Sequence, residues 1–593
     1  MSEGREKLPD EPPRRRRRTS RERRGFFAAA IWRQPWLWGT LLFAGTLLFW
    51  LRTAGFGFVF DDRVQILTDG YVHHLGNFWQ LLSLHVLGQD VMDRTRPVQL
   101  LSLMLDSALW GLRPAGYHLT NILLHAGSTL LLFLLALRLS VSFAEFSGKD
   151  DRQAVGRAGA RFGALAAALL FALHPVQVEA VCVPSFREDL LATFFLLAGL
   201  LAAAVFADRL RHQFDTTPER LADGGIPDRR SPYLPGCIMV LCLLLAAGAK
   251  ETGVAGPPLL FLFGWLAMHS GALPSSGGAR RRWWPWAALA AVIVGAFYLA
   301  VWRLAPAHSE IFNPAMPLAP SLLASAAVQA RIFAMDVMHV VAGCGYSAVY
   351  TPQSLKDYDL PMAVPLLALT LTAGIIGCLW SRMARFGFAW IVLALLPISN
   401  IVPIYNPVAD RYLYLPMAGV GLWLAALLAR GWRRRALRWP QAAAVAVVAV
   451  LLAALSWQRM AVWHDQLSLC NDMIKHEPEH PDAFDGLGYV LYDAGRLAES
   501  EAAFRKAISL RKNYADAWAG LAMVREKRGD RAEADKAMTR AAWFDARYAD
   551  IDQVFRAQEI ERQHAEAMRP ICRRIQDSPA LVRKRAAQPP AAP

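Results

Sequence analysis

Residues 189–207 read DLLATFFLLAGLLAAAVFA, and this stretch decides the fold class. Only its first residue, Asp189, is charged, and its length matches the roughly 20 apolar residues that a helix needs to cross a bilayer. Charged residues bound it on both sides, with Arg187 and Glu188 before it and Asp208 after it. We therefore expect a membrane-spanning helix here.

Comparable apolar stretches recur through most of the 593-residue chain. The sequence is 54% hydrophobic and only 19% charged, which is too apolar for a soluble protein of this length. The predicted spans are 36–58, 117–138, 160–178, 189–207, 233–249, 254–270, 284–304, 361–380, 386–403, 412–430 and 440–457. The sequence therefore predicts an all-α polytopic membrane protein with about eleven transmembrane helices, in a transmembrane domain over residues 36–458.

Basic residues predict the orientation of these spans. The net charge is +15, and basic runs such as Arg14 to Arg18 lie before or between the apolar stretches. Loops rich in Arg and Lys stay in the cytoplasm because positive charge resists translocation. With the basic segment 1–35 in the cytoplasm, the cytoplasmic loops are 139–159, 208–232, 271–283, 381–385 and 431–439, and each contains Arg or Lys. This pattern indicates a membrane protein and argues against nucleic-acid binding.

The stretch 321–350 is apolar enough to be considered as a twelfth span. Counting it would place Arg382 and Arg385 on the outer face, so we interpret it as an interfacial or re-entrant segment. The C-terminus then faces the periplasm or the lumen. The corresponding location is the inner membrane of a bacterial cell or the endoplasmic reticulum membrane of a eukaryotic cell.

The composition changes after residue 458 to mixed charge with a helical period. Phe484, Leu487, Gly488, Gly495, Phe504 and Ala507 recur 34 positions later as Trp518, Leu521, Ala522, Gly529, Met538 and Ala541. This period and pattern resemble the tetratricopeptide repeat, a pair of antiparallel helices with small residues where the helices cross. We expect a small helical repeat domain over 459–570 on the outer face, with flanking helices within 463–480 and 550–570, and a disordered tail over 571–593.

The first outer loop, 59–116, opens with two adjacent carboxylates. Asp61 and Asp62 follow directly on the aromatic end of the first span, at Phe60. Neighbouring carboxylates repel each other and are partly desolvated at a membrane boundary, so one of them can have a raised pKa and serve as a base. The alternative is a solvated helix end that an Asp merely caps.

Ionisable residues also gather at the other outer turns. Arg96 precedes Pro97, and His118 lies on one face of the second span with Asn121 and His125. The remaining outer turns contain His174 with Glu179, Arg187-Glu188-Asp189, Lys250-Glu251 and Asp410-Arg411. Any one of these turns is explained by an internal salt bridge, but ionisable groups are expensive at a membrane and their number favours a functional site. Together they would supply a carboxylate base and several cations for a phosphate.

The sequence gives little support to a metal site. His174 and Glu179 are five residues apart in a loop that contains proline, which matches no zinc-ligand helix. We expect no required cofactor; a divalent cation held by Asp61, Asp62 and Glu179 is the alternative.

In their order along the chain, these motifs resemble those of a known family. Phe60-Asp61-Asp62, Arg96-Pro97, Gly116-Tyr117-His118, His174-Pro175, Arg187-Glu188-Asp189, Lys250-Glu251 and Ala409-Asp410-Arg411-Tyr412 precede the repeats. The series resembles the transmembrane and tetratricopeptide repeat-containing (TMTC) O-mannosyltransferases, which are similar to the GT-C superfamily of polytopic glycosyltransferases. The resemblance covers residues from about 36 to 545, and it implies a GT-C-like transmembrane domain.

The resemblance also implies an activity and roles for the site residues. The donor would be a polyprenyl-phosphate sugar, of the undecaprenyl or dolichyl type, used on the periplasmic or lumenal face with inversion at the sugar carbon. Asp61 would be the base, and Asp62 would orient the acceptor or Asp61. Arg96 would hold the donor phosphate, with Arg187, Lys250 and Arg411 as further phosphate ligands. The substrate pocket would be lined by His118, His174, Glu179, Asp189, Glu251 and Asp410.

Three other functions remain open from the sequence. The first is a transferase that modifies a lipid or a cell-surface glycan, although repeats on the same face favour a polypeptide acceptor. The second is a transporter of lipid-linked sugar, which should carry polar residues at mid-span and broken helices. The third is a scaffold that gathers partners through its repeats, which has no need of paired carboxylates facing several arginines.

Overall fold

The computed structural model describes residues 34–89, 91–143, 150–214, 231–270, 277–304, 321–351, 354–402, 406–556 and 561–576, with a few single residues besides. Throughout this described part of the chain, all regular secondary structure is helical. Residues 1–33 of the predicted N-terminal segment and most of the predicted tail lie outside it.

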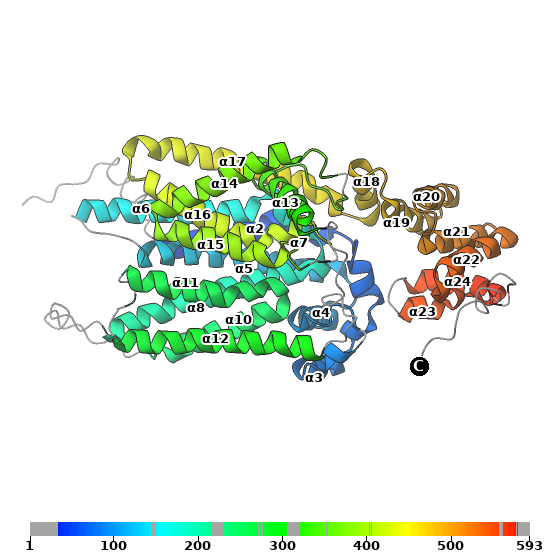
Figure 1. Cartoon of the computed structure of the whole chain (residues 1–593), viewed down its shortest axis with the longest axis horizontal. Coiled ribbons are helices and arrows are strands. Elements are labelled where there is room, and N and C mark those ends of the chain that lie inside the picture. The colour runs from blue at the N-terminus through cyan, green and yellow to red at the C-terminus, as the bar shows by residue number, and fades with distance from the viewer. Residues whose placement is uncertain are drawn as a thin grey trace, which may run out of the picture.

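Long helices form a bundle, and most of them run side by side along the long axis of the molecule (Figure 1). They are α2 (Pro35–Trp50), α5 (Pro114–Ser142), α6 (Asp150–Leu173), α8 (Arg187–Phe214), α10 (Tyr233–Ala249), α11 (Gly256–His269), α12 (Gly277–Leu304), α14 (Leu360–Trp380), α15 (Arg382–Leu395), α16 (Tyr414–Gly431) and α17 (Arg438–Met460). Each predicted span overlaps one of these helices. The chain is therefore an all-α polytopic membrane protein.

Eight helical segments of the described residues are long and apolar enough to cross a membrane. Helix α10 is apolar but shorter, and α11 and α15 have 14 residues each. A helix of that length is only about 21 Å long, against a hydrocarbon core of about 30 Å. The 3₁₀ turns Glu251–Ala255 and Leu396–Ile398 extend α11 and α15 at one end. The number of eleven spans therefore stays a prediction, as does their orientation.

Small residues bring neighbouring helices of the bundle into close contact, as is usual in membranes. A Cβ atom added at Gly163 of α6 would lie 2.3 Å from the carbonyl oxygen of Ala425 in α16. One added at Gly387 of α15 would lie 2.8 Å from the carbonyl oxygen of Gly419 in α16. Helix α16 thus packs closely between α6 and α15. This packing fixes the position of the segment directly before α16, which contains Asp410 and Arg411.

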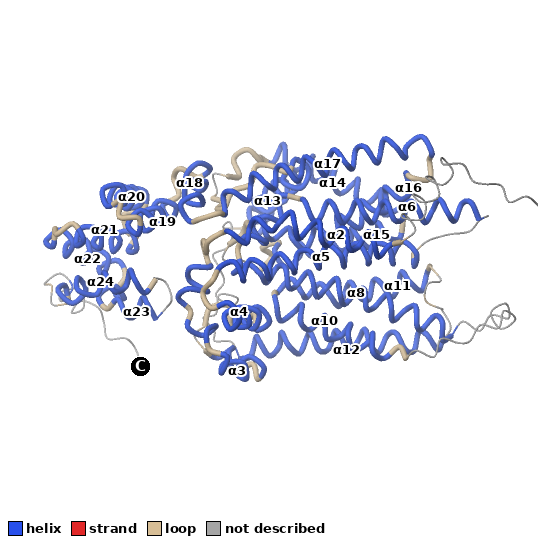
Figure 2. Tube along the Cα trace, turned by 180° about the vertical axis from the view of Figure 1, so that it is seen from behind, coloured by secondary structure: helices blue, strands red, loops and turns tan. Residues whose placement is uncertain are grey.

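The first outer loop folds over one end of the bundle, which we call the site end (Figure 2). It contains α3 (Phe78–Leu82) and α4 (Pro97–Trp110) with several 3₁₀ turns. The stretch predicted to be interfacial or re-entrant forms α13 (Leu322–Ala342), which packs on α14 and is not among the segments apolar enough to span. Basic residues such as Arg138 and Arg209 lie toward the opposite ends of their helices.

Beyond the site end lies the C-terminal helical domain, residues 466–575 (Figure 1). Its helices are α18 (Gln466–His476), α19 (Pro481–Asp493), α20 (Leu497–Leu510), α21 (Ala515–Lys527), α22 (Arg531–Phe544), α23 (Ile551–Arg556) and α24 (Arg562–Ile575). The hairpins α19–α20 and α21–α22 follow the 34-residue period, and α18, α23 and α24 occupy the predicted flanking stretches. Helix α24 extends to Ile575, into the predicted disordered tail, because Ile571 and Ile575 are buried.

Candidate active site

Asp62 is held inside the protein by two backbone groups. Its side chain is fully buried, and its Oδ1 atom accepts a hydrogen bond of 2.7 Å from the N–H of Ser185. Its Oδ2 atom accepts one of 3.2 Å from the N–H of Val59. Burial raises the pKa of Asp62 to about 7, against the lowering effect of these hydrogen bonds. Asp62 therefore fixes the loop in place.

Asp61 has a different environment from its neighbour. Its side chain is only partly buried, and no hydrogen bond to its carboxylate occurs within the described residues. Its backbone carbonyl accepts hydrogen bonds from Val64 and Gln65, at 3.1 and 2.8 Å. Burial raises the pKa of Asp61 to about 6, although the nearby Arg411 guanidinium lowers it. A carboxylate with this pKa and with no hydrogen-bond partner among the described residues is suited to accept a proton near neutral pH.

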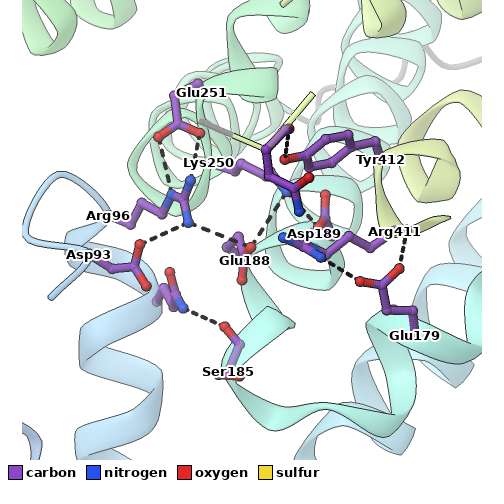
Figure 3. A network of polar contacts seen from close by, with 12 residues as sticks. Asp93, Arg96, Glu179, Ser185, Glu188, Asp189, Lys250, Glu251, Arg411 and Tyr412 are labelled. Atoms are coloured by element: carbon purple, nitrogen blue, oxygen red, sulfur yellow. Dashed lines mark hydrogen bonds and ion pairs between the residues drawn. The ribbon is translucent and has the colours of Figure 1, made fainter. Parts of the chain in front are cut away.

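Three cations lie at the site end, each ion-paired to carboxylates (Figure 3). The first is Arg96, which immediately precedes α4. Its Nε and Nη2 atoms donate to the two oxygens of Glu251 at 3.1 and 3.2 Å, and its Nη1 atom lies 2.9 Å from Asp93 and 3.6 Å from Glu188. Burial opposes ionisation of Glu251, but Arg96 outweighs it and keeps the pKa of Glu251 below its ordinary value.

The second cation is Lys250, at the C-terminal end of α10. Its side chain is 4% exposed, and its Nζ atom lies 2.6 Å from Asp189 and 3.5 Å from Glu188. It also lies 5.1 Å from the centre of the Tyr412 ring. Glu188 thus contacts both Lys250 and Arg96 and sets their spacing.

The third cation is Arg411, which precedes α16. Its backbone N–H and its guanidinium both donate to Glu179, and the guanidinium lies 3.8 Å from the centre of the Phe186 ring. Its Nε atom is buried and has no hydrogen-bond partner within the described residues. Arg411 is also the cation whose charge acts most strongly on Asp61, and this charge lowers the pKa of that carboxyl.

Arg187 was predicted to be a phosphate ligand, but it lies in the protein interior with an exposed fraction of 0%. Its Nε atom donates to Asn121 at 2.7 Å, and Nη2 donates to the carbonyl of Tyr117 and contacts Asp106. Its Nη1 atom donates to the carbonyl and the hydroxyl of Ser102. These contacts comprise four hydrogen bonds and the ion pair with Asp106. Arg187 therefore holds α4, α5 and α8 together from inside the protein.

Three further residues predicted to line the pocket make contacts of their own. His118 and His174 are buried, and their Nε2 atoms contact the carbonyls of Gly57 and Val340 at 3.4 and 3.0 Å. Asp410 accepts a hydrogen bond from Tyr350 and lies 3.9 Å from Arg459. Within the described part of the chain, no group of three or more His, Cys, Asp or Glu side chains is arranged to hold a metal ion.

The structure adds residues that the sequence reasoning did not select. Asp93 and Glu188 bind Arg96, while Phe186 and Tyr412 pack against Arg411. Glu188 and Tyr412 lie next to residues that were selected, and adjacency alone could have suggested them. Asp93 carries no such signal. Its backbone has a positive φ angle of 52°, and its side chain forms an ion pair with Arg96.

The fold and the site together define a polytopic membrane protein with a carboxylate and three cations at one end of its helical bundle. Several proteins are similar to this chain in sequence. The chain is 25% identical to the protein O-mannosyl-transferase Tmtc3 of Drosophila melanogaster, over 77% of this chain and 53% of that protein. It is 24% identical to the protein O-mannosyl-transferase F38B6.6 of Caenorhabditis elegans, over 80% and 63%. It is 25% identical to the protein O-mannosyl-transferase TMTC4 of Mus musculus, over 78% and 64%.

These matches confirm the resemblance found in the sequence: the chain is TMTC-like. It spans between about half and two thirds of the length of these relatives. No family model and no solved structure matches it.

Proposed function

We propose that the protein is a membrane glycosyltransferase that moves a sugar, mannose, from a polyprenyl-phosphate donor to a hydroxyl group. The acceptor is a Ser or Thr of a polypeptide, and the reaction occurs on the periplasmic or lumenal face. The observation that carries this proposal is the Asp61 carboxylate, which makes no hydrogen bond within the described residues and is close enough to Arg411 for that charge to lower its pKa. An acceptor hydroxyl and an anionic leaving group need these two functions side by side.

The proposed reaction is a single displacement. Asp61 accepts the proton of the acceptor hydroxyl while the hydroxyl oxygen forms a bond to the anomeric carbon of the sugar. The bond from this carbon to the phosphate oxygen breaks, and the electron pair leaves with the polyprenyl phosphate. Attack opposite the leaving group inverts the sugar carbon. The phosphate departs as an anion, so it needs cations more than it needs an acid.

The three cations are held in place before the donor arrives, which is the condition for efficient electrostatic stabilisation. Arg411 is the cation whose charge acts most strongly on Asp61, so a phosphate beside its guanidinium would lie near the base. Arg96 and Lys250 share Glu188, so a donor phosphate can replace part of that contact without moving either cation. The carboxylates around the cations keep them charged and oriented in a partly buried site.

An apolar cavity next to the cations suits the lipid part of the donor. It has a volume of about 310 Å³ and is lined by Thr95, Ala247, Glu251, Val254, Tyr298, Val301, Trp302 and Pro397. Glu251 belongs both to this lining and to the Arg96 ion pair. A polyprenyl chain in this cavity would therefore bring its phosphate close to Arg96. Trp302 and Val254 are exposed at its edge, as expected for an opening toward the bilayer.

The relatives support a polypeptide acceptor, since each is named a protein O-mannosyl-transferase. The C-terminal helical domain lies beside the site and could hold such an acceptor. The placement on the outer face rests on the positive-inside rule, because basic residues gather at the helix ends opposite the site. A metal ion has no part in the proposed mechanism.

The test is reconstitution of the purified full chain with radiolabelled polyprenyl-phosphate mannose and a pool of Ser/Thr-rich peptides. Wild type is compared with Asp61→Asn, with and without EDTA. Asp208→Asn serves as a matched control, since Asp208 lies toward the opposite end of α8, where it pairs with Arg138. Transfer that is lost in Asp61→Asn alone and is indifferent to EDTA supports the proposal. Transfer that survives Asp61→Asn, or labelling of a glycan or lipid in place of peptide, contradicts it.

A further inference from the structure

The backbone on the N-terminal side of Asp61 is bound by the first residue of the C-terminal helical domain and by the segment that directly precedes this domain. The N–H of Phe60 donates a hydrogen bond of 2.9 Å to the Oε1 atom of Gln466, the first residue of α18. The N–H of Gly57 donates one of 3.1 Å to the carbonyl of His464, two residues before α18. Each of these contacts joins residues some 400 positions apart in the sequence.

Phe60 has an unusual conformation that needs this support. Its φ angle is 52°, in the left-handed region that bulky residues seldom adopt. Its ring packs edge-on against Trp463 and Phe186, with ring centres 6.4 and 6.0 Å apart. Strained residues of this kind persist only when their surroundings hold them. The Gln466 hydrogen bond and the two rings are the surroundings that hold Phe60.

The C-terminal side of Asp61 is tied to the same domain by Arg63. Its Nε atom lies 2.5 Å from Glu561, and its Nη2 atom lies 3.4 Å from Asp493. Asp493 ends α19 and also contacts His564 of α24 at 2.8 Å. Arg63 thus reaches two elements that are far apart in the sequence of the domain.

We propose that the C-terminal helical domain positions Asp61 for the reaction, with Gln466 as the positioning residue. The inference rests on the proposed function, and it assigns the domain a role beyond binding an acceptor. Asp61 lies between Phe60, which Gln466 holds, and Asp62, which Ser185 of the membrane bundle holds. Arg411 belongs to the bundle, so the placement of the Asp61 carboxylate relative to Arg411 depends on how the domain sits on the bundle.

This arrangement predicts which kinetic constant changes. Arg96, Lys250 and Arg411 make their ion pairs without help from the C-terminal helical domain, so donor binding does not depend on Gln466. Loss of the Gln466 acceptor lets Phe60 relax toward negative φ and turns Asp61 away from its place. Misplacing a reacting group by about 1 Å can cost roughly 100-fold in rate. The rate constant kcat should therefore fall while KM for the donor stays constant.

The experiment compares wild type with Gln466→Ala and Gln466→Glu in the full chain. The Glu variant keeps a side-chain oxygen that can accept the Phe60 N–H. Gln553→Ala is the control, because Gln553 is an exposed glutamine of the same domain whose side chain, within the described residues, hydrogen-bonds to Asp550. Steady-state transfer from polyprenyl-phosphate mannose gives kcat and KM, and hydrogen exchange measures the backbone amides of residues 57–65.

The expected result for Gln466→Ala is a kcat about 10- to 100-fold lower with the donor KM within twofold, together with faster exchange at 57–65. Gln466→Glu should recover most of kcat, and Gln553→Ala should behave as wild type. An unchanged kcat in Gln466→Ala, or no rescue by Glu, overturns the inference. If wild type itself transfers no sugar, the proposed function fails. Hydrogen exchange then tests separately whether Gln466 holds the backbone of residues 57–65, and unchanged exchange in Gln466→Ala overturns that part of the inference.

Discussion

The Oδ1 atom of Asp62 accepts a hydrogen bond of 2.7 Å from the backbone N–H of Ser185, which joins the first outer loop to the start of α8. With Val59 on its other oxygen, Asp62 is fully engaged, while the adjacent Asp61 carboxylate remains open. The two neighbouring carboxylates thus differ in their surroundings, since backbone N–H groups hold one of them and the other makes no hydrogen bond within the described residues. Three predictions rest on this difference, and the packing of the C-terminal helical domain adds a fourth.

Asp61→Asn should abolish transfer and leave the fold intact. Asparagine has nearly the same shape, but it cannot accept the hydroxyl proton as a carboxylate can. General bases contribute roughly 100- to 10,000-fold to rate, so a loss of at least about 100-fold is expected. The side chain makes no hydrogen bond within the described residues, so the melting temperature should change little. Transfer kinetics and thermal unfolding of the same preparation check both statements.

Asp62→Asn should show its effect in stability, with a pH dependence of defined sign. The pKa of Asp62 is raised to about 7 by burial, above its ordinary value of 3.8. Between these values the folded state binds more protons than the unfolded state, so this group's contribution to stability is lost as pH rises toward and through 7. Asparagine does not titrate. The melting temperature of the variant minus that of wild type should therefore rise between about pH 4 and 7 and level off above, and a constant difference would contradict the assignment.

The pH–rate profile should have an acidic limb set by Asp61. Its pKa is raised to about 6 by burial, and Asp61 must be ionised to accept a proton. The value of kcat/KM should therefore fall as pH drops below about 6. Arg411 lowers the pKa of Asp61, so Arg411→Gln should move the midpoint of this limb to higher pH, besides reducing the rate. A midpoint that stays in place or moves down would exclude Asp61 as the titrating group.

The sequence predicted the helices well, whereas the contacts that distinguish the site residues from one another are seen only in the structure. The lengths of the apolar stretches locate the membrane helices, because a helix in lipid needs about 20 apolar residues. The 34-residue period locates the helices of the C-terminal helical domain, because each repeat packs on the next with the same residues. The separate roles of Asp61 and Asp62 depend on the N–H of Ser185, which lies more than 100 residues away in the chain. The burial of Arg187 likewise depends on three helices meeting around it. Contacts of this kind are set by the tertiary fold and leave no local pattern.

The packing of the C-terminal helical domain allows a last prediction, on Gly520. The ring of Phe504 in α20 fits between Gly488 of α19 and Gly520 of α21, and a Cβ atom at Gly520 would lie 2.3 Å from this ring. Phe504 is fully buried, so its ring has little room to move. Gly520→Ala should therefore destabilise the domain by about 1–3 kcal/mol, the usual cost of overpacking a core. Gly295→Ala in α12 is the control, because nothing lies within 4 Å of its added Cβ. Limited proteolysis of the full chain against temperature should show earlier cleavage of the C-terminal helical domain in Gly520→Ala only. Equal protection in both variants would mean that the three helices do not pack around Phe504 as described.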